Sequence, residues 1–172
     1  KYLINLPLEL RRYLDLVITK NKFTYINFGT QIEPFISEFL EARLKKARFI
    51  RKQSDFQLAR NKNEFPDFTL KSTEPNFVID YKVGSKTGFN KDVVIERKNS
   101  ANDLGTINSW PDKIKKFSDN IFFVFVIYSF SGKENKIKID EIQIRPFYNF
   151  IGVNSSGILS FRAKDGNLRP IN

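Results

Sequence analysis

Two aspartates and a lysine stand at the ends of two hydrophobic runs in the middle of the chain. Asp67 lies near the start of the run at residues 65–70, whereas Asp80 and Lys82 lie at the end of the run at residues 77–81. Ser, Pro and Asn between the runs predict a turn, so the runs should pair as a hairpin. Because side chains alternate along a strand, Asp80 and Lys82 must face one side. The hairpin brings Asp67 near that side, which places two carboxylates and one ammonium together.

Such a cluster has a specific chemical use. Two neighbouring carboxylates repel, and one of them would be pushed toward protonation unless a cation neutralises the pair. Mg²⁺ suits this position because it binds carboxylate oxygens together with water and phosphate oxygens. The bound ion lowers the pKa of a water molecule and stabilises charge on a phosphoryl group. The cluster therefore predicts metal-dependent phosphodiester hydrolysis with Mg²⁺ as cofactor, and we expect Mn²⁺ to substitute for it.

The sequence around these residues resembles a known family. Residues 65–70 (Phe-Pro-Asp-Phe-Thr-Leu) and 79–82 (Ile-Asp-Tyr-Lys) are similar to the PD-(D/E)xK nuclease superfamily. Within it they resemble type II restriction endonucleases of the EcoRV kind, which carry a similar Pro-Asp-Phe-Thr-Leu … Glu-Pro-Asn … Ile-Asp-x-Lys run. The match covers residues 65–82, and the rest of the chain is compatible with it.

The resemblance implies roles for individual residues. Asp67 and Asp80 would bind Mg²⁺ together with the backbone carbonyl of Tyr81, and Lys82 would position the attacking water. The products would carry 5′-phosphate and 3′-hydroxyl ends. A restriction role implies a homodimer on a palindromic site in double-stranded DNA, because the symmetry of the protein mirrors that of the sequence it reads.

A helix before the predicted hairpin carries a further candidate acid. Gly29 and Thr30 precede a run in which apolar residues recur at helical spacing. Thr30 and Glu33 fit the pattern of a capping box, which is a purely structural role. The resemblance instead implies that Glu33 points from this helix toward the metal as a catalytic residue, with Glu38 or Glu41 as alternatives.

A second Glu-x-Lys sequence creates a rival site. An apolar run ends in Glu96 and Lys98, and Asp80 could serve as the upstream acid for that pair. We favour the first assignment because Asp67 supplies the missing acid partner for Asp80 and Lys82. Glu96 and Lys98 are then expected on a neighbouring strand that faces DNA or solvent.

Composition and charge limit the possible function classes. The chain contains no His and no Cys, which excludes histidine bases, imidazole or thiolate metal sites and cysteine nucleophiles. The formal net charge is +10, and residues 42–62 hold eight basic residues against one acid. A polyanionic partner is therefore expected, and double-stranded DNA is our prediction. The alternatives are a solvated basic surface and an anionic membrane surface, the latter without an amphipathic anchor helix to support it.

The chain is expected to be cytoplasmic, in a bacterium or archaeon, and not to enter a membrane. The apolar run at residues 121–130 is too short to span a bilayer. No secretory signal is visible at the start, and the lack of an initiator Met leads us to expect a trimmed terminus.

The order of predicted helices and strands indicates an α/β fold with a mixed central sheet flanked by helices. The resemblance implies that this is a restriction-endonuclease-like PD-(D/E)xK core. We expect one nuclease domain over residues 1–172, with a hydrophobic content of 41% supplying its core. The active site should lie at one edge of about five strands. The predicted helices cover residues 5–19, about 30–44 and 109–117, and the predicted strands cover residues 48–53, 56–58, 65–70, 77–81, 93–98, 121–128 and 137–144. The last strand should contain a bulge or a break at Asp140 and Glu141, where its apolar alternation slips.

Polar, turn-rich segments are the candidate DNA-reading regions, and each is equally compatible with ordinary turns. Residues 84–88 form a predicted loop, residues 99–109 are rich in amide side chains, and residues 152–157 are small and polar. The last segment matches the place where EcoRV-like enzymes read the major groove, but it also fits a plain hairpin. The predicted DNA contacts are Lys86, Asn99, Asn102, Thr106, Asn108, Asn154, Ser155 and Arg162.

The terminal elements at residues 1–28 and 145–172 are candidates for dimerisation or DNA recognition. Two other functions stay open at this point. One is a repair or junction-resolving nuclease of the same superfamily, which would share the same active site. The other is a non-catalytic basic DNA-binding module, which would leave the clustering of Asp67, Asp80 and Lys82 unexplained.

Overall fold

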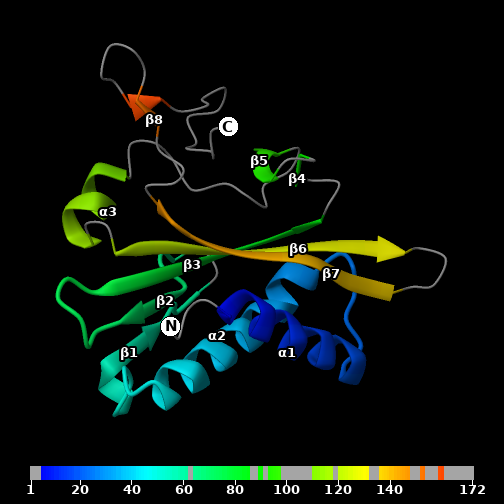
Figure 1. Ribbon diagram of the computed structural model, residues 1–172, viewed down its shortest axis with the longest axis horizontal. Helices are drawn as coiled ribbons and strands as arrows, with labels where there is room; N and C mark the ends of the chain where they lie inside the picture. The colour runs from blue at the N-terminus through cyan, green and yellow to red at the C-terminus, as the bar shows by residue number, and fades with distance from the viewer. Residues whose placement is uncertain are drawn as a thin grey trace.

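A computed structural model describes residues 5–61, 64–85, 89–90, 93–97, 110–117, 120–131, 136–147, 152–153 and 159–160, and among these the side chains of 5–61, 64–85, 111–117, 120–131 and 136–147. Helices α1 and α2 lie against one face of a sheet, and α3 lies on the other side (Figure 1). The prediction of an α/β fold with a five-stranded mixed sheet is confirmed.

The described elements follow one another in a simple order. The helices are α1 (Leu6–Lys20), α2 (Phe28–Lys46), the short 3₁₀ helix η1 (Gln53–Asp55) and α3 (Trp110–Phe117). The strands of the main sheet are β1 (Phe56–Leu58), β2 (Phe68–Leu70), β3 (Phe77–Ser85), β6 (Ile121–Ser131) and β7 (Lys136–Pro146). Two small hairpins join β4 (Phe89–Asn90) to β5 (Val93–Arg97) and β8 (Gly152–Val153) to β9 (Leu159–Ser160).

The sheet has the strand order β1-β2-β3-β6-β7. Strands β3 and β6 are parallel, whereas the other neighbouring pairs are antiparallel. A parallel pair needs a crossover connection, and α3 lies on the one between β3 and β6. The apolar strand at residues 121–128 is central, as predicted. Phe123 and Phe125 are fully buried on one face of β6, and Val124 and Val126 are fully buried on the other.

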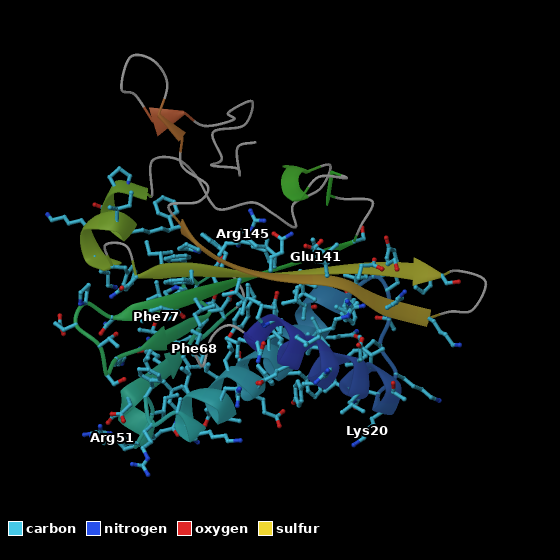
Figure 2. The ribbon with its side chains drawn as sticks, viewed as in Figure 1. Lys20, Arg51, Phe68, Phe77, Glu141 and Arg145 are labelled. Atoms are coloured by element: carbon cyan, nitrogen blue, oxygen red, sulfur yellow. The ribbon has the colours of Figure 1, made fainter. Side chains whose placement is uncertain are left out.

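The hydrophobic core lies between the sheet and the two long helices. Each helix buries one stripe of side chains spaced three or four residues apart, which is the spacing of one helical face. Phe68 on β2 joins this core, and Glu141 and Arg145 on β7 point to the face away from α1 and α2 (Figure 2). Each fully buried large side chain contributes about 1.5–3 kcal/mol. The buried stripes are Leu6, Leu10, Leu14 and Val17 on α1, and Phe28, Ile32, Ile36 and Leu40 on α2.

The predicted break in the last strand is confirmed as a bulge. Ile127 pairs with Glu141 and the next residue, Tyr128, pairs with Ile139, so that Asp140 has no partner in the register. An extra residue in one strand reverses the side to which the following side chains point. Ile139 and Ile142 therefore both face the helix-side core although they are an odd number of positions apart.

The strand predicted at residues 48–53 is wrong. Residues 47–52 form a turn followed by bends, and Arg48 adopts a left-handed backbone conformation with φ of 63°. The Asp55 carboxylate accepts hydrogen bonds from the backbone N–H groups of Arg51 and Lys52, at 2.8 and 3.0 Å. Such local side-chain bonds satisfy the backbone and compete with strand pairing.

The capping box predicted for the second helix is also wrong. Helix α2 begins at Phe28, so Thr30 lies inside the first turn and its hydroxyl donates to the carbonyl of Asn27 at 3.0 Å. Phe28 is fully buried and opens the stripe that continues at Ile32, and this packing sets the earlier start. Glu33 is consequently within the helix and not at its first turn.

The two strands of the predicted catalytic hairpin differ in length. Strand β2 is shorter than expected and begins only at Phe68, whereas β3 is longer and continues to Ser85. The second half of β3 is held by its parallel pairing with β6. On its other side, β3 has no β2 partner beyond Ile79. The sheet is therefore open beside Asp80 and the residues that follow it.

Three further expectations concern the rest of the chain. The predicted short third helix is present as α3. Gly84 and Ser85, expected in a loop, belong to β3. Strand β5 pairs with β4 and is not a neighbour of β3, so the expectation that its residues lie on a neighbouring strand of the main sheet is wrong for residues 93–97. None of the helices in the described ranges is long and apolar enough to cross a membrane.

Candidate active site

Asp67 and Asp80 lie side by side where β2 begins. Phe68 on β2 pairs with Ile79 on β3, and the antiparallel register places the next two residues, Asp67 and Asp80, next to each other. The Asp67 carboxylate accepts a hydrogen bond from the backbone N–H of Tyr81 at 2.5 Å. That N–H has lost its strand partner, and the Asp67 side chain replaces it. The residue directly before β2 is thus fixed against β3 by its own carboxylate.

Lys82 contacts Asp80 directly. Its Nζ lies 2.7 Å from an Asp80 carboxylate oxygen, and the two side chains are 20% and 7% exposed. Asp80 and Lys82 therefore face the same side of the sheet, as strand alternation predicts. Ile79 and Tyr81 belong to the helix-side core, so Asp80 and Lys82 point to the opposite, α3-facing side of the sheet. One ammonium faces two carboxylates, which leaves the cluster with an uncompensated negative charge.

This charge imbalance raises the pKa of Asp67. Burial, and then the neighbouring Asp80 carboxylate, raise the pKa of Asp67 to about 7. The Tyr81 N–H and the Lys82 ammonium act in the opposite direction without cancelling the rise. In the absence of a further cation, the pair therefore holds a proton at mildly acidic pH.

Glu33 reaches the same cluster from α2. Burial raises its pKa, while Lys82 lowers it and Asp80 raises it, so both charges are close enough to act on Glu33. One turn further along α2, the Ser37 hydroxyl lies 3.0 Å from the Tyr81 hydroxyl and ties the helix to β3.

The alternatives on α2 have other partners. Glu38 hydrogen-bonds the hydroxyl of Tyr13, and Glu41 forms an ion pair with Lys45 at 2.5 Å. Glu33, Glu38, Glu41 and Asp67 nevertheless line a single cavity of about 530 Å³ beside α2. This side of the cluster is therefore acidic.

Helix α3 brings a second lysine to the cluster, which sequence reasoning missed. The half-buried Lys113 places its Nζ 4.2 Å from the ring centroid of Phe65, two residues before Asp67. Burial lowers the pKa of Lys113, and Asp80 and Lys82 act on it in opposite directions. No local spacing connects Lys113 with the hairpin, because it reaches the site through the crossover between β3 and β6. In the sequence, the only indication of this role was that Lys113 lies on the apolar side of the short helix α3.

A polar groove continues from Phe65 on the α3 side. It has a volume of about 200 Å³. Lys71 and Lys116 contribute two exposed ammonium groups, and Glu64 contributes an acid that accepts a hydrogen bond from the backbone of Arg60 at 2.6 Å. The other lining residues are Gln57, Leu58, Ala59, Phe65, Pro66, Thr69, Asn76 and Phe117.

The donor set suits a hard divalent cation. Asp67 and Asp80 offer carboxylate oxygens from adjacent strands, and the repulsion that raises the pKa of Asp67 is what such a cation would relieve. Within the described residues, no group of three or more His, Cys, Asp or Glu side chains has a metal-binding arrangement. A site here would consequently use two carboxylates together with backbone and solvent oxygens, as the resemblance implies for the carbonyl of Tyr81.

The remaining predicted site residues cannot be placed. Lys86, Asn99, Asn102, Thr106, Asn108, Asn154, Ser155 and Arg162 lie outside the described residues, as do Lys98 and the side chain of Glu96. Residues 152–153 and 159–160 pair as a hairpin, which agrees with the structural alternative for that segment. The DNA contacts and the homodimer stay predictions.

Comparisons with known proteins support the fold. No protein-family model matches the chain, and no curated protein matches it by sequence. Among solved structures, the chain is similar to the NlaIV restriction endonuclease, with a TM-score of 0.50 and 17% sequence identity. The alignment covers 80% of this chain and 52% of that one, so this chain spans about half the length of its structural neighbour. The restriction-endonuclease-like fold is therefore shown, and the EcoRV-type assignment stays a prediction.

Proposed function

We propose that this protein is a metal-dependent endonuclease that hydrolyses phosphodiester bonds in double-stranded DNA. The observation that carries the proposal is the adjacency of Asp67 and Asp80, with Lys82 at 2.7 Å from Asp80, at the middle strand of a restriction-endonuclease-like sheet where its pairing with β2 stops. Two half-buried or buried carboxylates repel each other, and a cation or a catalytic role is a physical reason for holding them together.

Asp67, Asp80 and the Tyr81 carbonyl would hold Mg²⁺. When bound, the ion would supply a water of lowered pKa and neutralise charge on the phosphate oxygens. Asp67 is already oriented by the Tyr81 N–H, so its free carboxylate oxygen needs little rearrangement to act as a ligand. Asp80 is in β3 and Asp67 directly precedes the paired strand β2, which limits the variation of their separation.

Lys82 would orient the nucleophile and the phosphate. Its ammonium carries three donors, and the ion pair with Asp80 uses one of them. The remaining donors can bind the attacking water and a phosphate oxygen. Glu33 would accept a hydrogen bond from the same water, since burial raises the pKa of its carboxyl and so makes it a stronger proton acceptor.

DNA is the substrate that the charge favours. The net charge of +10 provides the general attraction to a polyanion. The structural neighbour is a restriction endonuclease, and we extend this to a type II enzyme that cuts at a short, palindromic site as a homodimer. The second candidate, a repair or junction-resolving nuclease, has the same catalytic residues and differs only in what it recognises.

Digestion of a sequence-defined plasmid with Mg²⁺ or with EDTA, followed by end mapping, tests the proposal. We expect discrete fragments with 5′-phosphate ends in Mg²⁺ and intact plasmid in EDTA. Cutting of a four-way junction without discrete plasmid fragments would favour the resolving enzyme. DNA binding that is insensitive to EDTA, without any cleavage, would indicate a non-catalytic module.

A further inference from the structure

We infer that the backbone of the DNA strand reaches the active site along the α3 side of the sheet. On this path Lys113 contacts the scissile phosphate, and Lys71 and Lys116 contact a neighbouring phosphate of the same strand. The inference rests on the proposed nuclease function and adds three phosphate-binding residues that the sequence signature does not contain.

The position of Lys113 is the first argument. Its Nζ lies over the ring of Phe65 at 4.2 Å, and both Asp80 and Lys82 are close enough to influence its charge. Burial is the main effect that opposes the charged form of Lys113; the attraction of Asp80 favours that form, and the repulsion of Lys82 opposes it more weakly. A phosphate between the two lysines would offset the desolvation and the repulsion with charge-assisted hydrogen bonds.

The groove provides the continuation of this path. Phe65 lies under the ammonium of Lys113 and also lines the groove that contains Lys71 and Lys116. The phosphate-binding groups therefore form a connected row and not an isolated patch. Glu64 is the one acid among the groove's lining residues, and its carboxylate is engaged by the Arg60 backbone. Asn76 and Thr69 add neutral hydrogen-bonding groups beside the two lysines.

The opposite side of the cluster disfavours a polyanion. The cavity beside α2 is lined by Glu33, Glu38, Glu41 and Asp67 and by no basic side chain. DNA phosphates in this cavity would face four carboxyl groups. Asp80 and Lys82 also point away from α2, toward α3. The two observations agree on the direction of approach.

The basic stretch at residues 42–62 does not offer a better path. Arg43 is paired with Glu9 at 2.5 Å, and Lys45 is paired with Glu41. Arg51 lies on the helix side of the molecule, as does Lys20 on α1 (Figure 2). The local density of basic residues in the sequence therefore does not mark the surface that faces the active site.

The first test compares two lysines on the same helix. Lys113→Gln should lower the single-turnover cleavage rate of plasmid DNA in Mg²⁺ by about 10²-fold, the effect of removing one group that stabilises transition-state charge. Lys115→Gln, its exposed neighbour on α3, should stay within about twofold. Lys113→Arg should recover part of the loss because it keeps the charge. Equal rates for the Lys113→Gln and Lys115→Gln variants would overturn the role of Lys113.

The second test compares two pairs of surface charges. Kd is measured for a fluorescein-labelled 20-base-pair DNA duplex in EDTA at increasing KCl. In Lys71→Gln/Lys116→Gln, the slope of log Kd against log salt should fall by about 1 to 2, because up to two phosphate contacts are lost. In Lys20→Gln/Arg51→Gln, which loses the same charge on the helix side, the slope should stay unchanged. Equal changes in both double variants would overturn the path, and matching Tm values establish that all variants are folded.

Failure of this inference can be told apart from failure of the nuclease proposal. The duplex-binding measurement is made in EDTA and requires no cleavage. If the wild type does not cut DNA but the salt slope falls only in Lys71→Gln/Lys116→Gln, the path stands and the nuclease activity does not. If the wild type cuts in Mg²⁺ and neither lysine test separates the variants, the activity stands and the path is wrong.

Discussion

The two sides of the Asp67–Asp80 pair carry opposite charge. Toward α2, the neighbouring side chains are acidic, and the charges of Asp80 and Lys82 both influence the pKa of Glu33. Toward α3, the neighbouring groups are lysines, with Lys113 at the cluster and two more along the groove. The elements that create the two sides are also different, since α2 precedes the sheet strands and α3 lies on the crossover between β3 and β6.

This difference suggests that the two sides bind different groups. Carboxylates on one side suit cations and water, whereas ammonium groups on the other suit phosphates. A phosphodiester hydrolase must bring both sets of groups to one phosphorus atom. The total charge of +10 predicts attraction to DNA, but the proposed side of approach depends on the placement of charge around β3.

The largest effect on the cleavage rate is expected from removing the carboxylate of Asp80, which lies between the two sides. Asp80→Asn should lower the cleavage rate by at least ~10³-fold, because it removes a proposed metal ligand and the partner of Lys82. DNA binding in EDTA should be unchanged or tighter, since a negative charge near the phosphates is lost. The exposed Asp15→Asn on α1 serves as the control and should cut normally.

The same experiment can expose the rival site. Loss of cleavage in Glu96→Ala together with full activity in Asp67→Ala would move the chemistry to Glu96 and Lys98. It would also remove the basis for the comparison between the two sides.

A smaller effect is expected on the acidic side. Glu33→Gln should reduce the cleavage rate about 10- to 100-fold without weakening DNA binding, because its role is to orient water and not to bind phosphate. Glu38 lines the same cavity but accepts a hydrogen bond from the Tyr13 hydroxyl. The Glu38→Gln variant should therefore cut DNA at the wild-type rate. Equal loss in both variants, or weakened DNA binding in Glu33→Gln, would contradict the assignment of this side to water and cations.

The smallest effect concerns stability without metal. Burial and Asp80 raise the pKa of Asp67 from an ordinary value of 3.8 to about 7, so the folded state holds an extra proton between these values. The free energy of unfolding should therefore fall as the pH rises through this window. In EDTA, Asp67→Asn should be more stable than the wild type at pH 8 by about 2 kcal/mol, or roughly 4–8 °C in Tm.

At pH 4 the advantage of Asp67→Asn should be much smaller, because the carboxyl is then neutral in the folded state and only about half ionised in the unfolded state. Thermal melts at pH 4, 6 and 8 measure this trend, with Asp15→Asn as the matched control. A stability difference that does not depend on pH would mean that Asp67 and Asp80 do not share their charge as described.

The core of the candidate site was predictable because it depends on local geometry. Alternation along a strand is enough to place Asp80 and Lys82 on one side, and a hairpin is enough to bring Asp67 near them. The bulge at Asp140 was predictable for the same reason, since it shows as a slip in the apolar pattern. The central strand followed from its apolar character on both faces.

The parts that escaped prediction depend on long-range packing or on competing local bonds. Lys113 reaches the cluster only through the chain path between β3 and β6, which no spacing in the sequence specifies. The start of α2 is set by the burial of Phe28, and Thr30 lost its predicted capping role as a result. The strand expected before η1 is replaced by a turn and bends because Asp55 binds the backbone there.

The dependence of plasmid cleavage on Mg²⁺, measured for the wild type and for Asp67→Asn, tests the central claim most directly. The claim is that the side chains at positions 67, 80 and 82 act on one phosphodiester with one divalent cation. The wild-type rate should rise from background in EDTA to a plateau with increasing Mg²⁺, while Asp67→Asn stays at background throughout. A wild-type rate that does not depend on Mg²⁺, or a variant that follows the wild-type curve, would contradict the claim.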